Sequence, residues 1–161
     1  MKNALQNIYT VLSSHGFADI INNNNTQQKS LHATAAFNAG ETICNFSAAT
    51  ELENPTYLTV QIGIKKHITL SPSFLQYINH SCEPNVFFNT STMELMALKN
   101  ISIGDELVFF YPSTEWNMTQ SFQCFCGSLQ CLHEIKGAAY LSAESISKYQ
   151  FTEFILKQLG A

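Results

Sequence analysis

The sequence of 161 residues predicts a mainly β domain of the α+β class, with a helical segment at each end. Across residues 30–111, short apolar and β-branched segments alternate with turn residues, which is typical of brief strands. Helical periodicity is confined to the two ends, and we find no internal repeat and few strand–helix–strand units. Because a chain of this length supports one hydrophobic core, we expect a single domain.

The N-terminal region, residues 1–26, is predicted to be a helical extension. Within residues 3–15 the apolar side chains recur at a spacing that indicates a short amphipathic helix, namely Leu5, Ile8, Tyr9 and Leu12. The polar asparagine run at residues 22–25 predicts a loop after this helix.

The central region, residues 27–112, is predicted to contain the strands of the core. We expect these strands at residues 42–46, 57–64, 67–70, 86–89, 93–98 and 106–111. Pro72 and Ser73 begin a turn, or a short helix that runs through residues 74–77. Pro112 cannot donate a hydrogen bond to a sheet, so it is expected to end the last strand.

Two further segments follow the strands. Residues 113–137 are predicted to be loop-like and contain three cysteines. Residues 138–161 are predicted to form a C-terminal helix, for which Ser142 is a suitable N-cap. The apolar side chains of this helix are Ile146, Tyr149, Phe154, Ile155 and Leu159.

Composition excludes several classes of protein. The chain has a net charge of -4, and its eight basic residues are all Lys. Because Arg is the residue best suited to bidentate phosphate contacts, we expect no direct binding to nucleic acid. The acidic balance instead suits a cationic substrate such as a lysine-containing tail. No apolar stretch approaches the roughly 20 residues of a membrane span, so no membrane association is expected.

The N-terminus also bears on location. It is too polar for the apolar part of a secretory signal, so we expect an intracellular protein. The sequence does not distinguish the cytoplasm from the nucleus. In such a compartment the five cysteines are expected to be reduced or metal-bound, not paired in disulfides. Cys44 is expected to be a small core residue.

The other four cysteines have a spacing that fits a tetrahedral zinc site. Cys124, Cys126 and Cys131 lie on one short segment, where Gly127 allows a sharp turn. Cys82, which lies 42 residues before the first of them, is the candidate for the fourth ligand. Two disulfides or unligated thiols remain alternatives. His133 could replace one ligand, but a solvent-facing side chain is the simpler expectation.

Three motifs in a fixed order resemble the SET-domain lysine methyltransferases with a post-SET zinc motif. The first is Asn-His-Ser-Cys-Glu-Pro-Asn at residues 79–85, the second is Gly-Asp-Glu-Leu-Val-Phe-Phe-Tyr at residues 104–111, and the third is Cys-x-Cys-x4-Cys at residues 124–131. The resemblance covers about residues 27–137. It implies the SET (β-clip) fold of short strands in small curved sheets, in which the first two motifs cross in a pseudoknot.

The resemblance also implies the cofactors and the site residues. S-adenosylmethionine would be the methyl donor, and Zn²⁺ would be held by Cys82, Cys124, Cys126 and Cys131. Tyr111 and Tyr57 would be the catalytic residues. The cofactor-binding residues would be Gln27, Lys29, Ser30, Tyr57, Asn79, His80 and Phe125. Phe109 and Tyr77 would line the substrate channel. The simpler expectations are that Tyr77 packs in the core and that Lys29 is a solvated charge.

Two positions depart from the pattern of the family. The family's motif Gly-x-Gly-Leu-Phe-Ala corresponds to residues 28–33 here, where both glycines are replaced, by Gln28 and Ser30. The residue before the final Tyr of the second motif is usually Asp and is Phe110 here.

The function that the resemblance implies is transfer of methyl groups to a lysine amine in a protein or peptide, with a histone tail as one possible substrate. Such a reaction needs a neutral amine, which an apolar channel favours by lowering the amine's pKa from ~10.4. The alternatives are a catalytically silent SET-like binding module stabilised by zinc, and a zinc-stabilised interaction domain that binds no cofactor. The protein is expected to be a monomer or a dimer.

Overall fold

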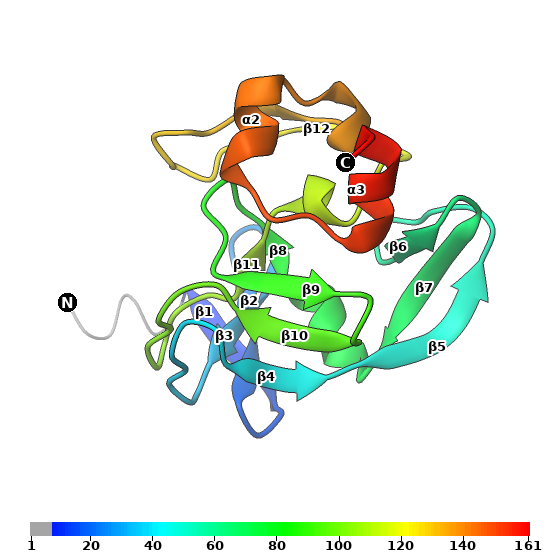
Figure 1. Ribbon diagram of the computed structural model, residues 1–161. Helices are drawn as coiled ribbons and strands as arrows, with labels where there is room; N and C mark the ends of the chain where they lie inside the picture. The colour runs from blue at the N-terminus through cyan, green and yellow to red at the C-terminus, as the bar shows by residue number, and fades with distance from the viewer. Residues whose placement is uncertain (1–7) are drawn as a thin grey trace.

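The computed structural model describes residues 8–161 and confirms the mainly β class (Figure 1). The first sheet has the order β1-β2-β3, with both pairs antiparallel, and consists of β1 (Tyr9–Ser14), β2 (Ala18–Asn23) and β3 (Lys29–Ala33). None of the helices in residues 8–161 has the length and apolar character that a membrane span requires.

The helix predicted over residues 3–15 is wrong for the described part of that range. Residues 9–14 form β1, and residues 1–7 lie outside the described residues. Gly16, with a φ of 77°, closes a hairpin that lays β1 along β2. A bulge between Val11 and Ser13 shifts the register, and Tyr9, Val11 and Leu12 are each about half exposed, so β1 has no buried apolar face. The loop predicted at residues 22–25 begins inside β2, which extends through Asn23.

Two three-stranded antiparallel sheets form the centre of the molecule. One has the order β4-β10-β9, from β4 (Thr42–Asn45), β9 (Val86–Asn89) and β10 (Glu94–Ala97). The other has the order β5-β7-β6, from β5 (Ser47–Leu52), β6 (Val60–Gly63) and β7 (Lys66–Ser71). Each of these strands except β5 was predicted. All six residues of β5 are exposed, so its sequence has no buried apolar face that would predict a strand.

Shorter elements connect these sheets. The 3₁₀ helix η1 (Ser73–Tyr77) confirms the short helix expected after Pro72. It leads into β8 (Asn79–His80), which pairs in parallel with β11 (Val108–Phe109). The strand predicted at residues 106–111 is shorter than expected, since Tyr111 begins the 3₁₀ helix η2 (Tyr111–Ser113). A last antiparallel pair joins β12 (Phe122–Gln123) to β13 (Glu134–Ile135).

The C-terminal region forms two short helices instead of one. A 3₁₀ helix, η3 (Ala138–Tyr140), precedes α2 (Ala143–Lys148) and α3 (Glu153–Leu159). Ser142 caps α2 as expected, by accepting a hydrogen bond from the Ser145 N–H. Thr152 caps α3 in the same way, and the extended backbone at Tyr149 separates the two helices. In Figure 1 these helices lie with β12 at one end of the molecule, above the sheet of β4, β10 and β9.

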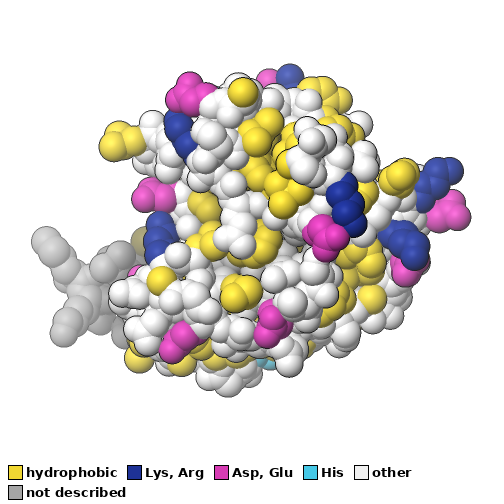
Figure 2. Space-filling model, viewed as in Figure 1, with side chains coloured by type: hydrophobic (Ala, Val, Ile, Leu, Met, Phe, Trp, Pro, Cys, Tyr) yellow, Lys and Arg dark blue, Asp and Glu magenta, His cyan; other side chains and the backbone are white. Residues whose placement is uncertain are grey.

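The sheets and the C-terminal helices each have a buried cluster of their own. The largest buried cluster is built from the sheets and includes Leu31, Ile68, Phe88, Leu95 and Leu107. A smaller cluster, Phe110, Ala138, Phe151 and Ile155, joins the C-terminal helices to the end of the second motif. On the surface, basic and acidic side chains are interspersed (Figure 2), and pairs such as Lys157–Glu153 at 2.7 Å join them.

Candidate active site

The first two motifs lie side by side, as the predicted pseudoknot requires. In the parallel pair of β8 and β11, Asn79 is opposite Val108 and His80 is opposite Phe109. Asn85, at the end of the first motif, lies across the second motif and is only 8% exposed. Its Oδ1 accepts the Val108 N–H at 2.9 Å, and its Nδ2 donates to the Glu106 carbonyl at 2.8 Å. These two hydrogen bonds explain why an amide side chain stands at this position, since it supplies both a donor and an acceptor.

Asn79 ties a third segment to this crossing. Its Nδ2 donates to the carbonyl of Lys29 on β3 at 2.8 Å and to Oε1 of Glu106 at 3.2 Å. The segment that corresponds to the family's glycine motif is therefore held against the crossing by a side chain of the first motif.

His80 links the crossing to Tyr111 and to the cysteines. Its Nδ1 accepts the Tyr111 N–H at 3.1 Å, and its Nε2 lies 3.4 Å from Cys82 Sγ. Burial lowers the pKa of His80 to about 4, so the imidazole is neutral. A neutral ring with an unprotonated Nδ1 can accept from Tyr111 while it donates from Nε2 toward sulfur.

The four predicted zinc ligands come together. The Sγ atoms of Cys82, Cys124, Cys126 and Cys131 all lie within 4.8 Å of one another, and those of Cys82 and Cys124 are 4.0 Å apart. A zinc ion ~2.3 Å from each sulfur would place tetrahedral ligands roughly 3.8 Å apart, so the cluster fits this ion. All five cysteines are free thiols, which does not support the alternative of two disulfides.

The remaining candidates for ligands lie elsewhere. Cys44 packs against the largest core cluster, as expected, and burial raises its pKa to about 11. His133 is exposed to solvent, also as expected. Within the cluster, burial raises the pKa of Cys124 to about 11. Burial alone would raise the pKa of Cys126 too, but hydrogen bonds from the backbone and from neighbouring thiols outweigh it and lower that pKa to about 6. The cluster thus favours at least one thiolate, the form that binds a metal.

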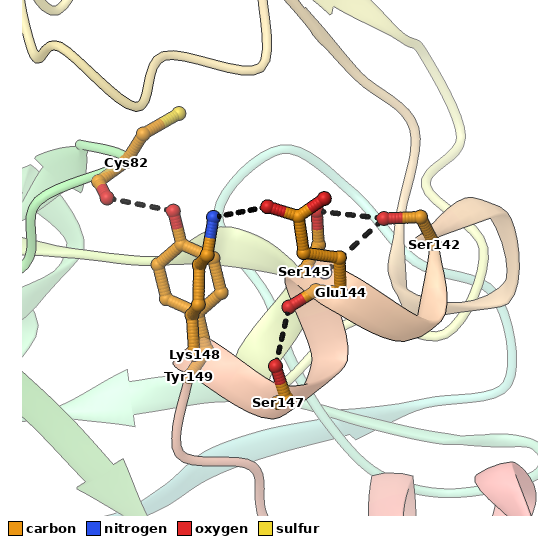
Figure 3. Close-up of polar contacts among 7 residues, drawn as sticks. All are labelled: Cys82, Ser142, Glu144, Ser145, Ser147, Lys148 and Tyr149. Carbon is orange, nitrogen blue, oxygen red and sulfur yellow. Dashed lines mark hydrogen bonds and ion pairs between the residues drawn. The ribbon is translucent and has the colours of Figure 1, made fainter.

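The C-terminal region holds the first motif from outside (Figure 3). The hydroxyl of Tyr149, just after α2, donates to the carbonyl of Cys82 at 2.8 Å. Its ring stacks on Phe110, with centroids 3.7 Å apart and an interplanar angle of 7°. Phe110 is 2% exposed, so the departure from the family's Asp is explained by an apolar contact with this region.

Two cavities share Tyr111 and Phe122 in their linings, and we call this pair of rings the shared wall. The His80 cavity, of about 710 Å³, is bordered by residues of all three motifs, among them Asn79, His80, Tyr111 and Phe125. The Glu115 cavity, of about 700 Å³, has a mainly apolar lining that includes Leu75, Phe88 and Phe109. Tyr111 and Phe122 line both cavities, and their ring centroids are 5.8 Å apart.

Most of the predicted site residues line one of these cavities. Ser30, Asn79, His80 and Phe125 line the His80 cavity. Phe109 and Tyr57 line the Glu115 cavity, although Tyr57 is 90% exposed.

Gln27, Lys29 and Tyr77 line neither cavity among the residues that the structure describes. Gln27 has a φ of 60° and its Nε2 donates to the Asn24 carbonyl at 2.8 Å. Tyr77 packs against the core, and Lys29 Nζ lies 5.8 Å from the centroid of its ring. The simpler expectations for Lys29 and Tyr77 therefore agree with where the structure places them.

Among the lining residues that sequence reasoning missed, three bear on the chemistry of the two cavities. Glu106 belongs to the second motif and faces the His80 cavity, so its place in the motif was a usable signal. Phe122 is separated from the third motif by one residue and forms part of the shared wall. Glu115 lines the Glu115 cavity but resembles an ordinary surface acid in the sequence, so only its burial reveals it.

Comparison with known proteins identifies the class to which this arrangement belongs. The SET domain family matches residues 28–112, which is more than half of the chain, so this protein belongs to the SET-domain family. Its fold is similar to that of the methyltransferase domain of human histone-lysine N-methyltransferase SETMAR. The TM-score is 0.50 and the sequence identity 14%, over 80% of this chain and 58% of that one.

The relatives within the family differ in how much of their length this chain covers. Methyltransferase flvH of Aspergillus flavus is 43% identical over 122 residues, which are 74% of this chain and 68% of that protein. The histone-lysine N-methyltransferase, H3 lysine-36 specific, of Debaryomyces hansenii is 30% identical over 91 residues, 50% of this chain and 12% of that protein. Human histone-lysine N-methyltransferase 2B is 32% identical over 69 residues, 39% of this chain and 2% of that protein. The chain therefore spans most of the first relative and a small part of the other two.

Proposed function

We propose that this SET-domain protein transfers methyl groups from S-adenosylmethionine to the side-chain amine of lysine in a protein or peptide. The observation that carries the proposal is the pair of cavities that share Tyr111 and Phe122. A methyl donor on one side of this wall and an amine on the other would meet beside Tyr111. Alignment of two reactants in this way contributes ~7–11 kcal/mol to lowering a barrier.

The His80 cavity is assigned to the cofactor. Its volume of about 710 Å³ is within the range of small-molecule sites, and its border combines polar groups with the exposed ring of Phe125. The Glu106 carboxylate faces this cavity and suits the amino group of the cofactor. Ser30 and Gln28 replace the family's glycines here, and the Ser30 hydroxyl is hydrogen-bonded to His32 Nε2 at 2.9 Å, which directs it along β3.

S-adenosylmethionine, when bound, supplies a methyl group on a positively charged sulfur. The chain supplies the surroundings for its transfer. Burial raises the pKa of Tyr111 to about 12, so its hydroxyl stays neutral and orients the reacting groups by weak polar contacts. The rings of Phe109 and Tyr111, with centroids 4.7 Å apart, present aromatic faces to a cationic centre. The apolar lining of the Glu115 cavity lowers the pKa of an entering amine, and solvent can take its proton.

The proposal includes a zinc ion at the four-cysteine cluster. The ion would join the third motif to Cys82 and so hold Phe125 at the border of the His80 cavity. The burial of the thiols and their mutual approach within 4.8 Å support a closed structural site with four sulfur ligands. An intracellular location, in which the thiols stay reduced, is part of the same proposal. The names of the histone-lysine relatives support a protein substrate.

The test is transfer of a labelled methyl group from S-adenosylmethionine to lysine-containing peptides, histones and lysate. The wild type should methylate lysine, and Tyr111→Phe should lower the rate about tenfold or more, since loss of weak contacts in the transition state is worth ~1.4 kcal/mol. Tyr140→Phe is the matched control, because Tyr140 is exposed on η3 and borders neither cavity.

Two results would contradict the proposal. Calorimetric binding of S-adenosylmethionine without transfer to any peptide or protein would favour a silent binding module. One zinc ion per chain without uptake of the cofactor would favour an interaction domain. Undiminished transfer by Tyr111→Phe would remove this residue from the catalytic role.

A further inference from the structure

A buried carboxylate lines the cavity that the proposed function assigns to the amine. Glu115 follows η2 and is 8% exposed, and its side chain borders the Glu115 cavity together with Tyr111 and Phe109. Its backbone N–H donates to the carbonyl of Tyr111 at 3.1 Å. The acid is therefore fixed one helical turn away from a residue that lines both cavities.

Only one oxygen of this carboxylate is occupied. Oε1 accepts the Gln61 N–H at 3.1 Å and the Thr114 hydroxyl at 3.1 Å. Gln61 is itself held, since its Oε1 accepts the Trp116 N–H at 3.0 Å. Within residues 8–161 no hydrogen bond reaches Oε2 of Glu115. Among the described side chains the fully enclosed polar atoms without a partner are His67 Nδ1 and Ser113 Oγ, so Oε2 of Glu115 is open to the cavity that this residue lines. A ligand in the cavity that donates to Oε2 would be stabilised.

The surroundings define the ligand that this oxygen favours. The described lining of the Glu115 cavity contains neither Lys nor His, so no protein cation neutralises the acid there. Most of the lining is aliphatic or aromatic, including Leu70, Leu75, Ile78 and Phe88. An acid with no protein cation beside it, in a mainly apolar cavity, fits a molecule with an apolar stem and a cationic nitrogen at its tip, because the cation favours the ionised form of the acid.

We propose that Oε2 of Glu115 binds the cationic amine of the entering substrate through a charge-assisted hydrogen bond and so positions its nitrogen beside Tyr111. The amine then gives a proton to solvent before its lone pair attacks the methyl group. The inference rests on the proposed function, because that function assigns this cavity to the amine. Glu115 would select an amine over an uncharged side chain of similar length. Charge-assisted bonds of this kind are about twice as strong as neutral ones, which makes one buried acid sufficient for the selection.

Binding of a small probe tests Glu115 without any requirement for turnover. The probe is n-butylammonium, which reproduces the stem and tip of a lysine side chain, and n-butanol is its neutral counterpart. The wild type should bind n-butylammonium at least about tenfold more tightly than n-butanol in titrations followed by NMR. Glu115→Gln keeps an oxygen that can accept from Gln61 and Thr114. This variant should bind n-butylammonium about tenfold or more weakly than the wild type does, with the affinity for n-butanol unchanged.

Kinetics with a lysine peptide provide the second measurement. Glu115→Gln should raise the KM for the peptide about tenfold or more, with the Kd for S-adenosylmethionine unchanged. Glu51→Gln is the control for the change in charge, because Glu51 lies on β5 at the surface, 4.0 Å from Lys66, and borders neither cavity.

The outcomes separate this inference from the proposed function. If the wild type methylates the peptide but Glu115→Gln has the same KM, the role of Glu115 is overturned and the function stands. If the wild type methylates nothing, the function is overturned, and the probe still decides on Glu115. Equal binding of n-butylammonium and n-butanol by the wild type overturns the inference even if the variant does not fold.

Discussion

Replacement of Asn85 by Ala should destabilise the protein more than any ordinary surface substitution. The change removes the acceptor of the Val108 N–H and the donor to the Glu106 carbonyl, which are 2.9 and 2.8 Å from the Asn85 side chain. Both backbone groups lie at the crossing of the two motifs, where Asn85 is 8% exposed and Leu107 is fully buried. A buried polar group that loses its partner costs ~1–3 kcal/mol. The expected loss of unfolding free energy is therefore ~2–6 kcal/mol, a large share of the ~5–15 kcal/mol of a typical domain.

Urea unfolding at constant zinc concentration measures this loss. Asn100→Ala is the matched control, since its Oδ1 accepts one hydrogen bond, from the Ala39 N–H at 2.9 Å, in an exposed turn. We expect the control to lose less than ~1 kcal/mol because solvent can replace the lost partner. A loss below ~1 kcal/mol for Asn85→Ala would show that water or backbone movement satisfies the crossing. The amide side chain would then not be what holds the two motifs together.

The remaining predictions concern zinc and Glu115. The wild type should contain one zinc ion per chain, and removal of the ion by a chelator or by Cys131→Ser should lower the melting temperature. Cys44→Ser is the control and should keep the metal, because Cys44 lies outside the cluster. A wild type that holds no metal, with a melting temperature that a chelator does not change, would contradict the site. Burial raises the pKa of Glu115 from 4.5 to about 7, so the folded state holds a proton that the unfolded state has lost between these pH values. The stability of the wild type relative to Glu115→Gln should accordingly fall as pH rises from 4.5 to about 7, by about 3–4 kcal/mol in total at ~1.4 kcal/mol per pKa unit. Urea unfolding of both proteins across this range measures the difference in stability, and a constant difference would refute the shift.

The parts of the site that could be predicted were those with closely spaced polar residues. Residues 79–85 and 104–111 are two runs that hydrogen-bond to each other, as Asn85 does to Val108 and Glu106. Thiols at short spacing form a cluster because the chain between Cys124 and Cys131 is too short to separate them widely. Ser142 was predictable as a cap for the same reason, since its partner is only three residues away.

The predictions of a single helix at each end of the chain were wrong because long-range contacts decide the structure there. Ile8, Tyr9 and Leu12 are spaced as on a helix, yet the hairpin at Gly16 makes residues 9–14 a strand. The predicted C-terminal helix is interrupted at Tyr149, whose ring stacks on Phe110 and whose hydroxyl reaches the Cys82 carbonyl. Intrinsic helix propensity is weaker than such contacts, so it did not decide either segment.

The sequence alone determined the SET family, the order of the motifs and the four cysteines that meet, because these depend on residue identity and short spacing. Only the tertiary structure decided which side chains face the two cavities. It turned Tyr77 toward the core, left Tyr57 at an exposed border and buried Glu115 beside Tyr111. The physical reason is that burial and unpaired hydrogen-bonding atoms are properties of the packed chain, and no local pattern of residues encodes them.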